Sequence, residues 1–144
     1  MKRVPFIAGN WKMNKTVVEA VELARQLKTA ISAVKEVEVA IAPPFTALYA
    51  VHQELRGSPI RLAAQNLFWE EKGAYTGEVS PLMLREAGCE YVLIGHSERR
   101  QFFGETDATV NRRIKAGLSQ GLKAMRFPES SGQPPRLGLI ASIP

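Results

Sequence analysis

Two short segments of the chain carry side chains that could bind and polarise a small anionic substrate. Asn10 and Lys12 follow the first apolar run of the chain, and His96 and Glu98 follow a later one. A lysine ammonium supplies positive charge, and a neutral imidazole can donate to an oxygen that becomes negative during a reaction. Taken singly, such a lysine is usually solvated and such a histidine is usually structural. The chemistry is therefore predicted only if the fold brings the two segments together.

The surrounding sequence predicts the elements that would do this. Short apolar runs that indicate strands lie at residues 4–9, 37–42, 60–64 and 91–95. Two of them are nearly continuous in apolar residues, which is typical of parallel strands covered on both faces. The segments between them are amphipathic, with helix-start signals in the capping box of Thr16 and Glu19, at Ser80-Pro81 and at Thr106. This alternation predicts consecutive right-handed βα units of class α/β. The carboxyl ends of such strands share one edge, where functional residues of these folds gather.

Composition narrows the class of protein further. The 144 residues carry a formal net charge of +5 and a single cysteine, Cys89, which excludes an intrachain disulfide and a multi-cysteine metal cluster. No apolar stretch approaches the ~20 residues of a membrane span. The arginines near Arg99 and Arg112 alternate with acidic residues, which argues against a nucleic-acid-binding face. We expect a cytoplasmic protein with no metal, no membrane partner and no nucleic-acid partner.

The connection over residues 65–79 is longer than the 2–6 residues of a minimal βα loop. It carries three aromatic residues, Phe68, Trp69 and Tyr75. Such a loop can contact a partner, or it can fold back onto its own domain. The residues alone leave both interpretations open. His52, on the helix expected after the second strand, is interpreted as an exposed helix residue. Glu105 and Asp107 are interpreted as favourable charges at a helix N-terminus.

Five motifs in register resemble the N-terminal half of the triosephosphate isomerase family, over about residues 4–123. They read Gly9-Asn-Trp-Lys-Met-Asn14, Ala42-Pro-Pro-Phe45, Ala64-Gln-Asn66, Gly73-Ala-Tyr-Thr-Gly-Glu78 and Ile94-Gly-His-Ser-Glu-Arg-Arg100. The resemblance implies the first half of a TIM (β/α)8 barrel, incomplete in this chain. It argues against another phosphate-handling βα protein that merely shares the lysine.

The same resemblance implies an activity and a set of site residues. Such enzymes interconvert dihydroxyacetone phosphate and D-glyceraldehyde 3-phosphate in glycolysis and gluconeogenesis, without a cofactor and as homodimers. By similarity, Lys12 stabilises the negative charge of the substrate, Asn10 orients it, and neutral His96 polarises the oxygens of the enediolate. Glu98 belongs to the hydrogen-bond network beside Lys12. The loop tip Tyr75-Thr76-Gly77-Glu78 reaches the neighbouring subunit.

The chain then departs from the family pattern. We expect four βα units over residues 1–122, followed by a Pro- and Ser-containing tail over 123–144 that need not be ordered. Residues 122–127 could begin a fifth strand. The segment of the family that carries the catalytic glutamate has no counterpart, because Glu129 is the only acidic side chain after Asp107 and lies in an unrelated context. An altered reading frame or aberrant termination would explain such a tail.

Two expectations follow from this departure. Four parallel strands cannot close a barrel, so two strand edges and an apolar inner face would lack partners. Without the base and the late phosphate-binding loops, we expect weak or no isomerase activity from the chain alone. The alternative is a non-catalytic fragment that associates with intact isomerase subunits through the 65–79 loop.

Overall fold

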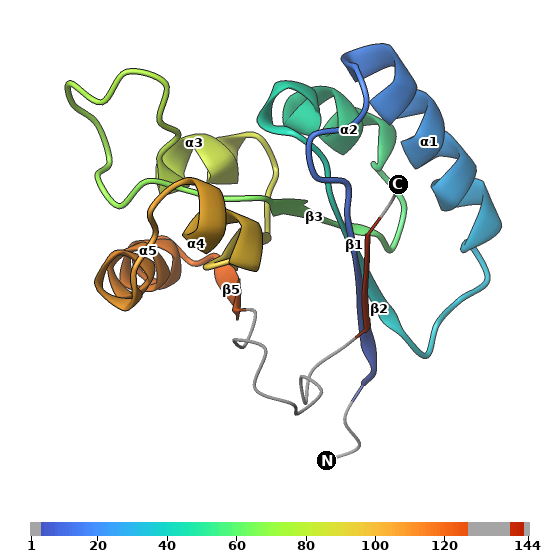
Figure 1. Cartoon of the computed structure of the whole chain (residues 1–144). Coiled ribbons are helices and arrows are strands. Elements are labelled where there is room, and N and C mark those ends of the chain that lie inside the picture. Colours follow the sequence, from blue (N-terminus) through green and yellow to red (C-terminus); the bar gives the residue numbers. More distant parts are fainter. Residues whose placement is uncertain (1–3, 127–138, 143–144) are drawn as a thin grey trace.

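The computed structural model describes residues 4–126 and 139–142, whose strands form one parallel sheet. The order of the strands is β5-β4-β3-β2-β1-β6, and every neighbouring pair is parallel. The sheet curls like part of a barrel wall, with the helices along its outer side (Figure 1). The elements are β1 (Phe6–Asn10), α1 (Val17–Ala30), β2 (Glu38–Ala42), the 3-10 helix η1 (Phe45–Ala47), α2 (Leu48–Glu54), β3 (Arg61–Ala64), α3 (Pro81–Glu86), β4 (Tyr91–Ile94), α4 (Ser97–Phe102), α5 (Asp107–Ser119), β5 (Lys123–Arg126) and β6 (Leu139–Ser142).

Strands β2, β3 and β4 are rich in apolar residues and are buried over most of their length, with side chains packed on both faces of the sheet. A large cluster between the sheet and the helices includes Ile41, Leu62 and Ile94. A smaller cluster on the inner face of the sheet is built largely from alanines, together with Tyr91 and Leu93. Burial on both faces confirms the expectation of parallel strands drawn from the continuous apolar runs.

The predicted helix starts are also present. The Thr16 hydroxyl accepts from the Glu19 backbone N–H while the Glu19 carboxylate accepts from the Thr16 N–H, which forms the expected capping box. The Ser80 hydroxyl accepts from the backbone N–H of Met83 at the start of α3. Thr106 caps α5 in the same way. These caps satisfy first-turn donors that the helix itself leaves unpaired.

The edge at β1 differs from expectation. We expected it to lack a partner, but β6 lies along β1 in parallel register, from Ile7 opposite Leu139 to Asn10 opposite Ser142. Pairing satisfies backbone groups that an open edge would leave exposed. Strand β5 pairs with β4, as the possible fifth strand predicted. The remainder of the predicted tail, residues 127–138 and 143–144, lies outside the described residues, and the boundary at residue 122 stays a prediction.

The interpretation of His52 as an exposed helix residue is wrong in part. Its ring is half-buried, and it packs over Gly88, which follows α3 with φ +98°. A Cβ atom at Gly88 would lie 2.3 Å from two ring atoms of His52. Gly88 is therefore required both by its backbone conformation and by this close approach.

We predict that Gly88→Ala destabilises the chain by about 2–4 kcal/mol, because left-handed strain adds to a steric clash. The matched control is Gly57→Ala, whose φ of +75° imposes strain but whose added Cβ would meet no atom within 4 Å. The control should cost only about 1–2 kcal/mol. Urea unfolding of both variants measures the difference, and equal losses would contradict the role given to His52.

Candidate functional site

The residues predicted to do chemistry lie around one cleft at the carboxyl edge of the sheet. Asn10 ends β1, Lys12 follows it, and His96 and Glu98 follow β4. The cleft has a volume of about 230 Å³. Its other lining residues are Met13, Phe45, Gln65, Asn66, Leu93, Arg99 and Phe103. The structure thus brings all four predicted rim residues together, while their chemical roles stay predictions.

Trp11 fixes the first of the two segments to the core. Its side chain is fully buried in the cluster between sheet and helices, and its backbone N–H donates to the Ala42 carbonyl at 3.1 Å. The residues on either side, Asn10 and Lys12, contribute to the cleft instead. The buried Trp11 side chain therefore anchors the segment to the core and leaves the side chains of Asn10 and Lys12 available at the cleft.

Lys12 adopts a backbone conformation that is rare for a residue with a side chain. Its φ is +53°, in the left-handed region, which costs an L-residue about 1–2 kcal/mol. The Asn10 carboxamide oxygen accepts from the Lys12 backbone N–H at 3.0 Å. The Gln65 amide donates to the Lys12 carbonyl at 2.8 Å. The site thus holds Lys12 in a strained conformation that directs its side chain across the sheet edge.

The Lys12 ammonium donates to the Glu98 carboxylate at 2.6 Å. This hydrogen bond is the main cause of a lowered Glu98 pKa, opposed by burial and assisted by the charges of His96 and Lys12. Among the described residues Glu98 is the only carboxylate that lines the cleft. Because it is ionised and paired, it is suited to position Lys12 and not to accept a proton from a substrate.

His96 precedes α4 and caps its first turn. Its Nδ1 accepts from the Glu98 backbone N–H at 3.2 Å, which places the proton of the neutral ring on Nε2. Burial of the ring lowers the His96 pKa, the Lys12 charge lowers it further, and the Glu98 charge opposes both. The imidazole is therefore neutral near pH 7 and can act as a hydrogen-bond donor.

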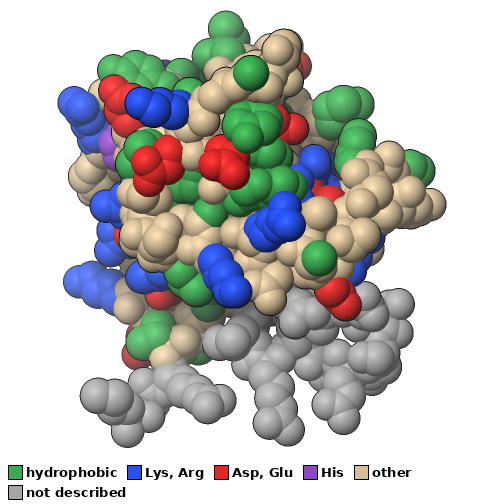
Figure 2. Space-filling view, turned by 90° about the vertical axis from the view of Figure 1, so that its left-hand side faces the viewer, with side chains coloured by type: hydrophobic (Ala, Val, Ile, Leu, Met, Phe, Trp, Pro, Cys, Tyr) green, Lys and Arg blue, Asp and Glu red, His purple; other side chains and the backbone are tan. Residues whose placement is uncertain are grey.

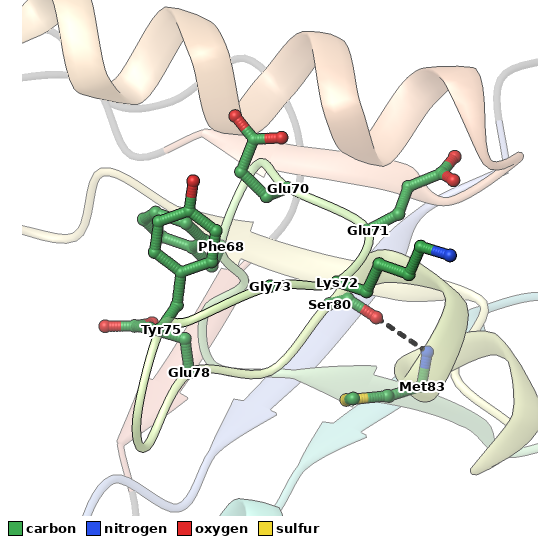
Figure 3. A pocket seen from close by; sticks show the side chains of 9 residues that line it. All are labelled: Phe68, Glu70, Glu71, Lys72, Gly73, Tyr75, Glu78, Ser80 and Met83. Atoms are coloured by element: carbon green, nitrogen blue, oxygen red, sulfur yellow. Dashed lines mark hydrogen bonds between the residues drawn. The ribbon is translucent and has the colours of Figure 1, made fainter.

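The base of the long loop folds back onto its own domain, while contact of its tip with a partner stays a prediction. At its base, the Arg113 guanidinium donates from Nε to the Leu67 carbonyl at 2.9 Å and lies 5.0 Å from the Trp69 ring centroid. Phe68 packs against Tyr75 with ring centroids 4.6 Å apart, as Figure 3 shows. The tip, residues 75–78, is exposed and lies away from the cleft. The loop projects from the body of the molecule in Figure 1.

The loop also borders a surface of mixed character. Figure 2 views the molecule from the side that carries the loop, and hydrophobic side chains are exposed there among acidic and basic ones. Tyr75, Leu82 and Met83 are among the exposed large hydrophobic residues of this part of the chain. A small pocket under the loop, of about 50 Å³, is lined by Glu70, Glu71 and others, and holds none of the predicted catalytic residues.

The interpretation of Glu105 as a simple helix-terminal charge is incomplete. Its side chain is only 2% exposed and forms ion pairs with Arg99, which lines the cleft, and with Arg113 at 3.6 Å. The carboxylate therefore lies between the cleft and the base of the long loop. Asp107, in the first turn of α5, pairs with Arg100 at 2.8 Å and fits the expected terminal charge.

Sequence reasoning assigned no role to Gln65 and Asn66, although both lie in the cleft. The signal that could have found them is their position directly after β3, at the same edge as the other two segments. Asn66 is buried, and its carboxamide oxygen has no hydrogen-bond partner among the described residues. Within that part of the chain, no group of three His, Cys, Asp or Glu residues is placed to hold a metal ion. None of its helices has the length and apolar character to span a bilayer.

A curled parallel sheet with outer helices, and a lysine and a histidine at its carboxyl edge, defines this chain as part of a (β/α) barrel with a rim site. The family model of triosephosphate isomerase matches residues 5–126. The chain belongs to the triosephosphate isomerase family.

Individual relatives agree with this assignment. The triosephosphate isomerase of Endomicrobium trichonymphae is 58% identical over 117 residues, covering 81% of this chain and 47% of the relative. That of Pelobacter propionicus is 55% identical over 123 residues, covering 85% and 49%. The crystal structure of the Bartonella henselae enzyme matches with a TM-score of 0.81 and 42% identity, over 86% of this chain and 51% of that one. The chain thus spans about half the length of the curated relatives it matches.

The lowered His96 pKa predicts a pH dependence of stability. Unfolded His96 takes up its proton near pH 6.5, whereas folded His96 does so only at lower pH. Between these two pKa values the unfolded state binds more protons, so the free energy of unfolding falls as the pH drops through this window.

NMR titration should show Glu98→Gln lowering the His96 pKa further, because it removes the opposing charge. A rise in that variant would contradict the electrostatics described here.

Proposed function

We propose that the chain supplies the electrophilic half of a triosephosphate isomerase site. The single observation that carries this proposal is the Lys12–Glu98 pair beside neutral His96 at the rim of a barrel of this family. Lys12 attracts the phosphate and the developing negative charge of the triose, and Asn10 orients the substrate. Glu98 holds Lys12 in place.

In this reaction a base removes a proton from one carbon of the ketose, and the carbonyl oxygen becomes the oxygen of an enediolate. The Nε2–H of His96 donates to that oxygen, which stabilises the charge as it forms. A proton then passes from the hydroxyl oxygen on that carbon to the former carbonyl oxygen, and the base returns its proton to the adjacent carbon, which gives the aldose. A neutral histidine that polarises the carbonyl oxygen is the established arrangement in triosephosphate isomerases.

The described residues that line the cleft include one carboxylate, Glu98, and its pairing with Lys12 makes it unsuited to act as the base. The acidic side chain nearest the C-terminus of the sequence, Glu129, lies outside the described residues. General acid–base catalysis contributes about 10²–10⁴-fold. We therefore propose that the chain alone binds triose phosphate and turns it over slowly or not at all.

We predict little or no triosephosphate isomerase activity when the chain is purified from a host that lacks its own isomerase. Lys12→Ala, prepared in parallel, controls for contamination because a trace of host enzyme would be unaffected by it. Activity in the wild-type chain that disappears in Lys12→Ala would overturn the proposal that the base is missing.

The C-terminal half of a relative, produced on its own and added to this chain, supplies the remaining barrel strands. The mixture allows the role of His96 in turnover to be distinguished from the role of Lys12 in substrate binding. If this mixture is active, His96→Gln should lower turnover by about 10²–10⁴-fold with little change in KM, since it removes a transition-state hydrogen bond. Lys12→Ala should abolish substrate binding. Equal loss of binding in both variants would contradict the roles assigned here.

A second candidate function is association with intact isomerase subunits without catalysis. It is favoured by the exposed loop tip at Tyr75 and Thr76, which projects from a base fixed by Arg113 (Figure 1). We predict that the chain co-purifies with a full-length relative and that Thr76→Arg abolishes this. Thr29→Arg, at an exposed position of α1, is the matched control and should leave this association unchanged. A strictly monomeric chain would exclude this function.

A further inference from the structure

Gln65 joins the loops at the ends of two other strands. Its Nε2 donates to the Lys12 carbonyl, beyond β1, and to the Ala42 carbonyl, at the end of β2, both at 2.8 Å. Carbonyl oxygens only accept, so these two partners fix the orientation of the amide. The side chain therefore bridges segments that are 53 and 23 residues away along the chain.

The contact with Lys12 is the one that the local structure requires. The Ala42 carbonyl already accepts from the Trp11 backbone N–H at 3.1 Å, so it is satisfied without Gln65. Lys12, in contrast, has a φ of +53°, and such strained residues persist only when their surroundings hold them. The Asn10 carboxamide oxygen accepts from the backbone N–H of Lys12, and the Gln65 amide donates to its carbonyl. The peptide groups on both sides of the strained residue are therefore fixed by hydrogen bonds.

We propose that Gln65 is a positioning residue that keeps Lys12 in its left-handed conformation, so that the ammonium reaches Glu98 and the cleft. Gln65 lines the same cleft as both residues. Gln65 follows β3, which lies in the sheet between β1 and β4, the strands that precede the two segments of the site. Its side chain is therefore suited to fix the position of one segment relative to the other. The inference deepens the proposed function, because Lys12 is the residue assigned there to the charge of the substrate.

The test measures the Lys12–Glu98 contact without substrate. Gln65→Met keeps the length of the side chain and removes both donors. We expect the Glu98 pKa, followed by carboxyl carbon NMR in the full chain, to rise toward the value measured in Lys12→Ala. Gln53→Met, on α2 and outside the cleft, makes the same chemical change and should leave the Glu98 pKa as in wild type. An unchanged Glu98 pKa in Gln65→Met would overturn the proposal.

Gln65→Asn provides a second, milder variant. It keeps the amide but is shorter by one methylene, so it cannot span both carbonyls, and we expect a rise in the Glu98 pKa smaller than in Gln65→Met. If both variants lose cooperative unfolding, Gln65 supports the fold as a whole and the positioning role is wrong.

Dihydroxyacetone phosphate binding separates this inference from the proposed function. We expect Gln65→Met to weaken binding about tenfold. Gln53→Met, outside the cleft, should bind as tightly as the wild type. Equal binding by Gln65→Met and the wild type would contradict the role of Gln65 in holding Lys12. A wild-type chain that does not bind the phosphate would refute the proposed function, while the Glu98 titration would still decide the role of Gln65.

Discussion

The contact between the Lys12 ammonium and the Glu98 carboxylate is the interaction on which the rest of the site depends. It joins a segment after β1 to a segment after β4, with β2 and β3 between them in the sheet. Because Glu98 is held ionised, it does not compete as a base, and its charge moderates the pKa of neighbouring His96. This ion pair thus positions the Lys12 ammonium, and the charges of both partners affect the pKa of His96.

That contact requires a sheet of defined curvature and a strained loop. Strands β2, β3 and β4 are buried over most of their length, and the curl of the sheet brings the segments after its strands to one cleft. Trp11 is buried in the core, and hydrogen bonds with Asn10 and Gln65 fix the backbone of Lys12, which follows it. The stability of the outer layer therefore supports the geometry at the rim, although no helix of that layer other than α4 contributes a predicted catalytic residue.

The sequence predicted those features that depend on local pattern. Continuous apolar runs indicated parallel strands, and capping residues such as Thr16 and Ser80 located helix starts, because both signals act over a few residues. The gathering of Lys12 and His96 followed from the topology of parallel strands. The resemblance to triosephosphate isomerases added a proposed activity and the individual roles, which no local pattern could supply.

The features that escaped prediction are long-range. The Gln65 amide meets its partner across 53 residues, and Glu105 is buried between two arginines from separate helices. The pairing of β6 with β1 joins the two ends of the described sequence. Each depends on how the sheet curls and which side chains then meet, and no spacing rule along the chain encodes this.

We propose that this chain binds triose phosphate through Lys12. The most direct measurement is a phosphorus NMR titration of dihydroxyacetone phosphate with the wild-type chain and with Lys12→Ala, following the His96 ring signals in parallel. We expect saturable binding that perturbs His96 in the wild type and is lost in Lys12→Ala. Equal binding by both proteins, or binding that leaves His96 unperturbed, would contradict it.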